Sequence, residues 1–275
     1  MIIDAHQHFW QLERGDYGWL MPDLASLYRD FMPDDLAPHL LQHDIDGTIL
    51  VQAAPTPAET EFLLDIADKT PFVLGIVGWT DFAAKSAASD IARLAKHPKL
   101  VGLRPMIQDI ADDDWMLRSV LTPAFEAMIQ CDLTFDALVL PRHLSQLRKL
   151  LSRHPNLRTV IDHGAKPDIS CGQFDDWANN IAVIAKESRA YCKLSGLLTE
   201  AGKDWTITEV APYVAHLLEH FGPERLVWGS DWPVLTKAAS YEIWIEVTVS
   251  LIPDERARKA ILGSNAGELY RLSET

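Results

Sequence analysis

The alternation of two kinds of segment along the chain constrains its fold more than any other feature. Short apolar runs, rich in residue types that favour strands, recur along the sequence, and longer segments with helical periodicity separate them. Several of the short runs are apolar on both faces, as parallel strands covered on each side should be. We expect eight strands, within residues 1–6, 47–53, 72–79, 100–106, 133–139, 158–164, 190–196 and 225–231. This order predicts a (β/α)8 barrel of the α/β class.

An open doubly wound sheet is the alternative arrangement, but the chain lacks its sequence signals. The turn after the first expected strand has no GxGxxG pattern, and no phosphate-binding P-loop occurs in the sequence. A length of 275 residues suits one barrel domain, and the chain contains no low-complexity tract or Ser/Gly linker. Residues 1–275 are therefore expected to form a single domain. Residues 10–29 lack clear periodicity and are expected to form a long loop over the mouth of the barrel.

The composition restricts the partners and the compartment. A formal net charge of −14 argues against nucleic acid and anionic membranes as partners, because both require a positively charged surface. The three cysteines include no CxxC pair, and the sequence shows no signal peptide and no apolar run long enough to span a bilayer. We expect a soluble cytoplasmic protein that acts on a small molecule, and we leave open whether it forms a homodimer.

Polar residues recur at the carboxyl ends of the expected strands, where barrels of this kind place their chemistry. Taken singly, each has a structural explanation: His163 could be a hydrogen-bonded buried histidine, and Asp231 could cap a turn. Four of them together, drawn from the first, sixth and eighth strands, favour a functional cluster. These four are His6, His8, His163 and Asp231. Further candidates for contacts with a ligand are Gln52, Trp79, Asp81, Arg104, Lys193 and Trp232.

Some of these candidates have equally good structural explanations. A tryptophan such as Trp79 or Trp232 can offer a flat face to a sugar ring, but it also fills core volume. Lys193 faces the barrel interior in only one of two registers, because a shift by one residue turns the side chain to the other face. Arg104 could bind substrate, or it could pair with an acidic residue at the mouth.

The histidine pair near the N-terminus has a defined geometry in an extended chain. His6 and His8 stand two residues apart, so a strand places both imidazoles on one face and Gln7 on the other. Such a pair can hold a metal ion, polarise a carbonyl or hydrogen-bond to its neighbours. Two other pairs have the spacing of helical zinc ligands but lack the glutamate directly after the first histidine, and we expect them on outer helices without a metal. They are His39 with His43, and His216 with His220.

With these residues in view, the sequence resembles the amidohydrolase superfamily, and within it the lactonases of the amidohydrolase 2 family. The resemblance covers nearly the whole chain and is greatest to sugar lactonases that open L-fucono-, L-rhamnono- or related aldonolactones. It rests on DAHQHFW at residues 4–10, VGLRP at 101–105, VIDHGAKPD at 160–168, CKLSGL at 192–197 and RLVWGSDWPV at 225–234. The resemblance implies a barrel whose active site lies at the carboxyl ends of the strands.

The resemblance also bears on metal content. Members of the superfamily with two metal ions bring a bridging lysine or glutamate from the fourth strand and a histidine from the fifth. This chain has Arg104 and Asp136 near those positions, so a two-metal centre is not expected. Because some lactonases of this branch work without a metal, we expect no required cofactor. The alternative is one Zn²⁺ ion, held by His6, His8, His163 and Asp231.

The expected reaction is attack of water on the carbonyl of a sugar lactone. Asp231 would act as the general base and later protonate the departing ring oxygen, while His6, His8 and His163 would polarise the carbonyl. Neutral imidazoles can do this only if each presents an N–H inward. Arg104 would bind substrate oxygens with its planar fork. A zinc-dependent decarboxylase or another hydrolase of the same family is the enzymatic alternative, and a sugar-binding barrel without catalysis is the non-enzymatic one.

Overall fold

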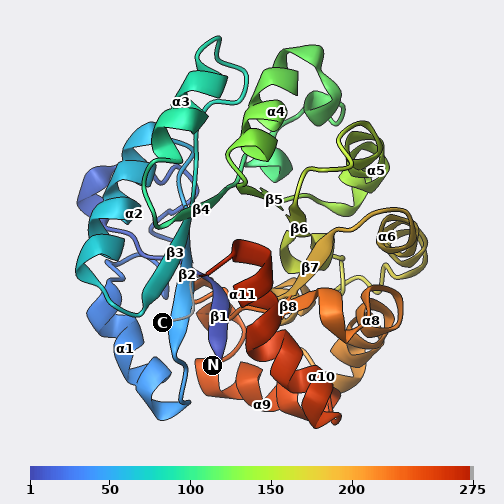
Figure 1. Cartoon of the computed structure of the whole chain (residues 1–275). Coiled ribbons are helices and arrows are strands. Elements are labelled where there is room, and N and C mark those ends of the chain that lie inside the picture. Colours follow the sequence, from blue (N-terminus) through green and yellow to red (C-terminus); the bar gives the residue numbers. More distant parts are fainter. Residues whose placement is uncertain (273–275) are drawn as a thin grey trace.

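A computed structural model describes residues 1–272 and shows a parallel (β/α)8 barrel. The strands pair in sequence order, each parallel to the next (Figure 1). They are β1 (Ile3–Gln7), β2 (Gly47–Val51), β3 (Val73–Gly78), β4 (Leu100–Leu103), β5 (Thr134–Ala137), β6 (Thr159–Ile161), β7 (Tyr191–Leu194) and β8 (Leu226–Trp228). A parallel bridge between Gln7 and Trp232 joins the first strand to the segment after the last. The structure thus confirms the predicted barrel and all eight expected strands.

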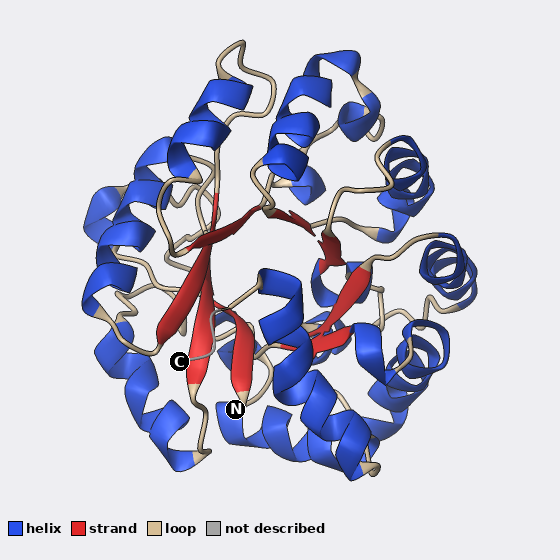
Figure 2. Ribbon diagram, in the orientation of Figure 1, coloured by secondary structure: helices blue, strands red, loops and turns tan. Residues whose placement is uncertain are grey.

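Helices surround the sheet, as Figure 2 shows. They are α1 (Pro33–Gln42), α2 (Pro57–Lys69), α3 (Ala87–Leu94), α4 (Thr122–Gln130), α5 (Leu144–Arg153), α6 (Asp175–Glu187), α7 (Leu197–Ala201), α8 (Ile207–Phe221), α9 (Tyr241–Leu251), α10 (Glu255–Lys259) and α11 (Asn265–Tyr270). Capping residues in the sequence determine where several of these helices begin. Thr56 and Thr206 accept hydrogen bonds from the backbone N–H groups three residues on, which satisfies donors that a helix start leaves free. The large apolar core lies between the strands and these helices.

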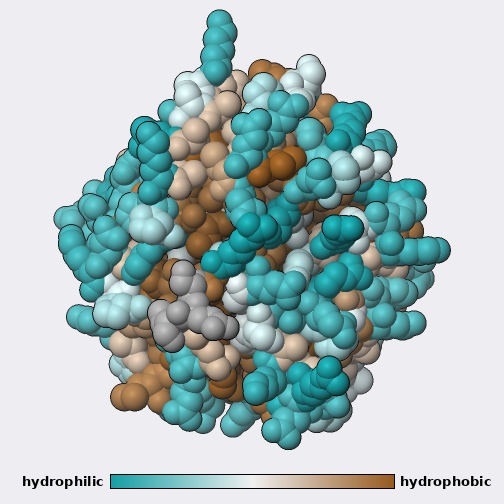
Figure 3. Space-filling view, viewed as in Figure 1, coloured by the Kyte–Doolittle hydropathy of each residue, from teal (hydrophilic) through white to brown (hydrophobic). Residues whose placement is uncertain are grey.

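The amino-terminal end of the barrel interior is apolar and closed by the last helix. Helix α11 lies across the barrel opening in the view of Figure 1. Ala266 and Leu269 of this helix pack with inward side chains of several strands, including Ile3 and Ala5 of β1. The backbone carbonyl of Leu269 also accepts a hydrogen bond from the Thr134 hydroxyl of β5. Hydrophilic side chains cover most of the outer surface in this view (Figure 3).

The segment between β1 and α1 forms the predicted loop over the mouth. Trp10 and Phe31 pair through their backbones in an antiparallel bridge, so the ends of the loop are held together. Inside it lies only one short 3-10 helix, η1 (Leu12–Arg14). The loop is tied to α2 by the buried Glu59, whose carboxylate accepts hydrogen bonds from the Tyr17 hydroxyl at 2.9 Å and from the Ala53 backbone.

Two further expectations concern the chain as a whole. No helix among residues 1–272 is both long and apolar enough to cross a membrane. Cys131, Cys171 and Cys192 are all free thiols.

Candidate active site

The carboxyl ends of the strands surround a cavity of about 380 Å³. His8, Arg104, His163 and Asp231 all contribute to its wall, although they come from four different strand ends. His6 is fully buried and does not line the cavity, so it lies one layer below this surface. The structure therefore brings the sequence-predicted cluster together but separates it into surface and buried members.

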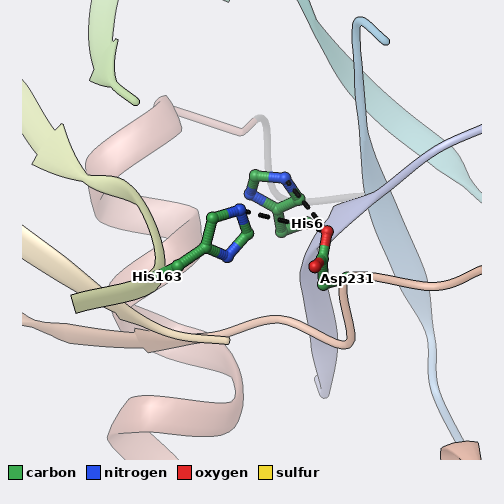
Figure 4. Close-up of side chains that lie close together, drawn as sticks. All are labelled: His6, His163 and Asp231. Atoms are coloured by element: carbon green, nitrogen blue, oxygen red, sulfur yellow. Dashed lines mark ion pairs between the residues drawn. The ribbon is translucent and has the colours of Figure 1, made fainter. Parts of the chain in front are cut away.

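Three side chains of the cluster point toward one another in Figure 4. The Asp231 Oδ1 atom lies 3.8 Å from His6 Nε2 and 3.9 Å from His163 Nε2. His8 lies closer, with its Nε2 atom 3.2 Å from both Asp231 Oδ1 and His6 Nε2. Burial alone would raise the pKa of Asp231, but neighbouring groups, the His163 and His6 rings among them, outweigh it and hold that pKa well below its usual range. Asp231 is therefore ionised at neutral pH.

The hydrogen bonds on the far side of each ring assign the tautomers. His8 Nδ1 lies 2.7 Å from the Val51 carbonyl and must donate to it, so a neutral His8 has a bare Nε2 atom facing the cavity. The Ser195 hydroxyl lies 2.8 Å from His163 Nδ1, and the described residues offer it no other hydrogen-bond acceptor. We therefore assign Ser195 as the donor and place the His163 proton on Nε2. Burial lowers the pKa of His163 to about 4, so this ring is neutral.

This assignment bears on one requirement of the sequence-based mechanism. Carbonyl polarisation by three neutral imidazoles needs an N–H from each ring, and His8 cannot supply one because its only proton is used by Val51. His8 is instead an acceptor at the cavity surface, beside the Asp231 carboxylate. Arg104, which lines the same cavity, is a donor that carries a permanent charge.

A buried group of charges lies directly beneath the cluster. The Lys193 ammonium is fully buried and has three acceptors, Asp136 Oδ2 at 2.5 Å, Asp162 Oδ1 at 3.0 Å and His6 Nδ1 at 3.1 Å. Because an ammonium can only donate, His6 Nδ1 accepts from Lys193, which favours the His6 proton on Nε2. Arg104 Nη1, also only a donor, lies 3.2 Å from that Nε2 atom and opposes this tautomer. Lys193 thus faces the barrel interior, and it acts on the site through His6 rather than through a contact with the cavity.

Arg104 is held by the same group of charges. Its Nη1 atom lies 3.2 Å from both Asp162 Oδ2 and His6 Nε2, and its Nη2 atom donates to the Gln52 carbonyl. The side-chain amide of Gln52 in turn donates to the Arg104 backbone carbonyl at 2.8 Å, so Gln52 contacts the arginine through two hydrogen bonds. Burial would raise the pKa of Asp162, but Lys193 and Arg104 are among the groups that hold it well below its usual range. The guanidinium is therefore positioned by an ionised, fully buried carboxylate.

The seam between β1 and β8 contains a residue for which sequence reasoning found no role. Asp4 accepts hydrogen bonds from the Ser230 backbone N–H at 2.8 Å, the Ser230 hydroxyl at 2.6 Å and the Tyr241 hydroxyl at 2.9 Å. These bonds fix the loop that carries Asp231 against β1. The Asp231 N–H adds a bond to the His6 carbonyl at 2.7 Å. The pairing of Asp4 with Ser230 joins residues 226 positions apart, and nothing in the local sequence could indicate it.

Two glycines leave room for the imidazoles. A Cβ atom on Gly229 would lie 2.6 Å from the Cβ atom of His6, and one on Gly196 would lie 2.8 Å from Nδ1 of His163. Gly196 also has a φ of +68°, a conformation that other residues rarely adopt. Both positions therefore need glycine so that the two rings can reach their observed places.

Of the six predicted ligand contacts, only Arg104 lines the main cavity; Gln52 and Lys193 lie among its buried supports, and the other three lie elsewhere. Trp79 and Asp81 line a neighbouring hollow of about 630 Å³, which shares Trp19, Met106 and Asp109 with the main cavity. Trp232 is only 2% exposed and packs edge-on against Phe9 and Phe31, so it fills core volume and does not line the cavity. The core explanation therefore holds for Trp232.

The donor atoms of the cluster fit one divalent metal ion. Among the described residues, His6, His163 and Asp231 offer ligand atoms that all lie within 4.8 Å of one another, and His8 adds a bare nitrogen beside them. Two features oppose ligation: the ammonium at His6 Nδ1 favours a proton on His6 Nε2, and the Ser195 hydroxyl at His163 Nδ1 favours a proton on His163 Nε2. A second group with this spacing, His216, Glu219 and His220, lies on the outer helix α8, away from the mouth.

Comparisons with known proteins identify the family of this chain. A family model described as amidohydrolase matches residues 3–272. A protein of Burkholderia ambifaria named L-fucono-1,5-lactonase is 46% identical over 98% of this chain and 95% of its own length. One of Burkholderia multivorans with the same name is 35% identical over 99% and 96%.

A solved structure extends the likeness to three dimensions. The crystal structure of an amidohydrolase from Burkholderia multivorans with bound zinc has a TM-score of 0.94 and 31% sequence identity. The match covers 99% of this chain and all of that chain. From sequence and fold alike, the chain belongs to the amidohydrolase family.

Proposed function

We propose that this protein hydrolyses a sugar lactone to the open-chain sugar acid. One observation carries the proposal: an ionised aspartate, a bare histidine nitrogen, an imidazole N–H and a guanidinium meet at a cavity of about 380 Å³. Ligand cavities commonly measure roughly 300–1,000 Å³, so this one suits a single small ring. The names of the relatives, L-fucono-1,5-lactonase among them, support a lactone as the substrate.

Water activation follows from two adjacent acceptors. Asp231 Oδ1 and His8 Nε2 stand 3.2 Å apart with no proton of their own between them. A water molecule on the cavity side of this pair can donate one hydrogen to each atom, which aims its lone pair into the cavity. Asp231 then removes a proton as the water oxygen attacks the carbonyl carbon. The low pKa of Asp231 makes it a weak base, and a lactone, as a reactive ester, tolerates that.

The oxyanion forms opposite this water. The Arg104 guanidinium and the His163 Nε2–H both line the cavity as hydrogen-bond donors, and both are fixed in advance by buried partners. When the tetrahedral intermediate collapses, the bond between the carbonyl carbon and the ring oxygen breaks. Asp231 returns its proton to that oxygen, so the product is a hydroxy acid that ionises and acidifies the solution.

One Zn²⁺ ion would be held by His6, His163 and Asp231 with His8, and when bound it would supply Lewis acidity at the carbonyl. The sequence-based prediction that the reaction needs no metal is kept, and the Lys193 contact with His6 supports it. We expect full activity after chelation, with less than one zinc per chain by elemental analysis. Loss of activity that added zinc restores would show instead that the metal takes part, as the decarboxylase alternative also requires.

The test of the function is a pH-indicator assay of a panel of aldonolactones against purified protein. We expect at least one to be opened far faster than it hydrolyses spontaneously. Asp231→Asn should lower turnover by about 10²–10⁴-fold while the sugar acid still binds. If no lactone in the panel is opened above the spontaneous rate, the proposal fails. If wild type and Asp231→Asn bind equally and neither turns over, the non-catalytic barrel is the correct alternative.

A further inference from the structure

The segment after β6 forms a left-handed turn that carries two cavity residues. The four residues 163–166 have φ values of +53°, +59°, +63° and +52°, and only the second is glycine. Left-handed conformations are unfavourable for residues other than glycine, so the surroundings must hold this turn in place. The Trp177 indole does so from outside, by donating to the Gly164 carbonyl at 2.7 Å. The result is that His163 and Lys166 both line the cavity.

Lys166 meets two partners that come from other parts of the barrel. Its ammonium lies 3.2 Å from Glu200 Oε1 on α7 and 3.3 Å from Gln108 Oε1, which follows β4. All three residues line the cavity, and Lys166 and Glu200 remain about a quarter exposed, at 25% and 23%. The pair therefore keeps hydrogen-bonding capacity free toward the cavity.

The same wall contains an unsatisfied hydroxyl. Thr199 lines the cavity, and its Oγ1 atom is buried with no hydrogen-bond partner among the described residues. Buried polar atoms in proteins are almost always satisfied, so this hydroxyl has hydrogen-bonding capacity that no described residue uses. Thr199 and Glu200 both line the cavity.

Another part of the cavity lining is apolar. Trp19, Leu24 and Leu27 of the loop over the mouth line the cavity with apolar surface. A cavity with one apolar wall and one wall of paired charges suits a molecule with carbon–hydrogen faces and hydroxylated edges. A sugar ring has both.

From this arrangement we propose that Lys166, Glu200 and Thr199 form the subsite that binds the ring hydroxyls of the lactone. Two adjacent hydroxyls would bridge the ion pair: one donates to the Glu200 carboxylate, and the next accepts from the Lys166 ammonium. Thr199 would bond to a further hydroxyl. This inference rests on the proposed function and adds a selectivity to it, namely that the enzyme prefers polyhydroxylated lactones to plain lactones of the same ring size.

The test compares two six-membered lactones, L-fucono-1,5-lactone and δ-valerolactone, which has no hydroxyl groups. Lys166→Met and Glu200→Gln should each lower kcat/KM for the sugar lactone by about 10- to 100-fold, mainly through KM, and change that for δ-valerolactone by less than about threefold. Lys166→Arg should recover part of the loss. Lys149→Met, an exposed position on α5 outside the cavity, is the matched control and should behave as wild type.

Calorimetry with the product acid, L-fuconate, gives a readout that needs no turnover. L-Fuconate should bind wild type at least about 10-fold more tightly than either variant. Thermal unfolding of each variant shows whether that variant is folded. If the variants lose kcat/KM equally on both lactones, the proposed subsite is wrong. It is also wrong if they lose no kcat/KM on the sugar lactone. If wild type opens δ-valerolactone as efficiently as the sugar lactone, the subsite is wrong but the lactonase activity stands. If wild type opens neither, the proposed function fails as well.

Discussion

The two ends of the barrel interior are built from the same strands by opposite means. At the amino-terminal end, Ile3 and Ala5 of β1 lie in an apolar layer that α11 seals. At the carboxyl end, the same strand supplies His6 and His8 to a group that includes three buried charges, Lys193, Asp136 and Asp162. The apolar end is stabilised by the exclusion of water from its side chains. The charged end is stable only if every buried charge has its partner. Mutations at the two ends should therefore fail in different ways.

The largest effect is expected from Lys193→Met. This change leaves Asp136 and Asp162 buried without their cation and removes the donor that fixes His6. Breaking a buried ion pair from one side costs about 3–5 kcal/mol, so we expect a loss of that order in unfolding free energy by urea titration. Lactone turnover by the remaining folded protein should also fall. A variant with wild-type turnover per folded molecule would show that Lys193 does not position the site.

Leu269→Ala at the opposite end should cost stability alone. Leu269 is 1% exposed within the sealed apolar layer, and removing such a side chain costs about 2–5 kcal/mol. Turnover per folded molecule should be unchanged at a temperature well below the unfolding midpoint. A change in KM or kcat for this variant would mean that the two ends are coupled, contrary to the comparison above.

Ser195→Ala tests how strongly activity at the charged end depends on one hydrogen bond to His163. The hydroxyl of Ser195 donates to His163 Nδ1 and so keeps the other ring proton facing the cavity. Without it the tautomer is free, and losses of about 10–100-fold in kcat are typical for partners of this kind. Stability should change by no more than about 1 kcal/mol. Ser195→Thr keeps the hydroxyl and is the control, expected to retain more activity than the alanine variant.

The smallest effect concerns the loop over the mouth and its dependence on pH. Burial raises the pKa of Glu59 from 4.5 to about 7. The folded state therefore favours the protonated carboxyl, and its contribution to stability is present below pH 4.5 and lost as the pH rises to about 7. Glu59→Gln should flatten this part of the curve of melting temperature against pH, whereas Glu61→Gln, at an exposed position, should leave it unchanged. An identical slope in wild type and Glu59→Gln would contradict the assignment.

The difference between the two ends also explains what the sequence could reveal. The apolar strands and helices repeat with regular periods, so the barrel and its eight strands were predictable. So was the gathering of polar residues at one end, because strand ends share an edge in a parallel barrel. The loop from Trp10 was predictable from its lack of a period.

The finer placement depends on contacts between distant residues. The pairing of β1 with β2 shifts register between Asp4 and Gln7, so simple alternation does not assign the faces of this strand. Alternation did place His6 and His8 together, but only the packing of Arg104 and Lys193 shows that His6 lies below the cavity. Likewise Trp232 follows a catalytic candidate in sequence, yet its ring belongs to the core.

The seam between the first and last strands has a consequence for how activity arises during folding. Asp231 joins His6 and His8 only where Ser230 meets Asp4 and Trp232 pairs with Gln7, so the proposed catalytic group is divided between the two ends of the chain. A ribosome must finish nearly the whole sequence before any of these contacts can form. Lactone opening in a refolding solution should therefore report closure of the barrel itself, and it should appear only when the last strand has docked against the first.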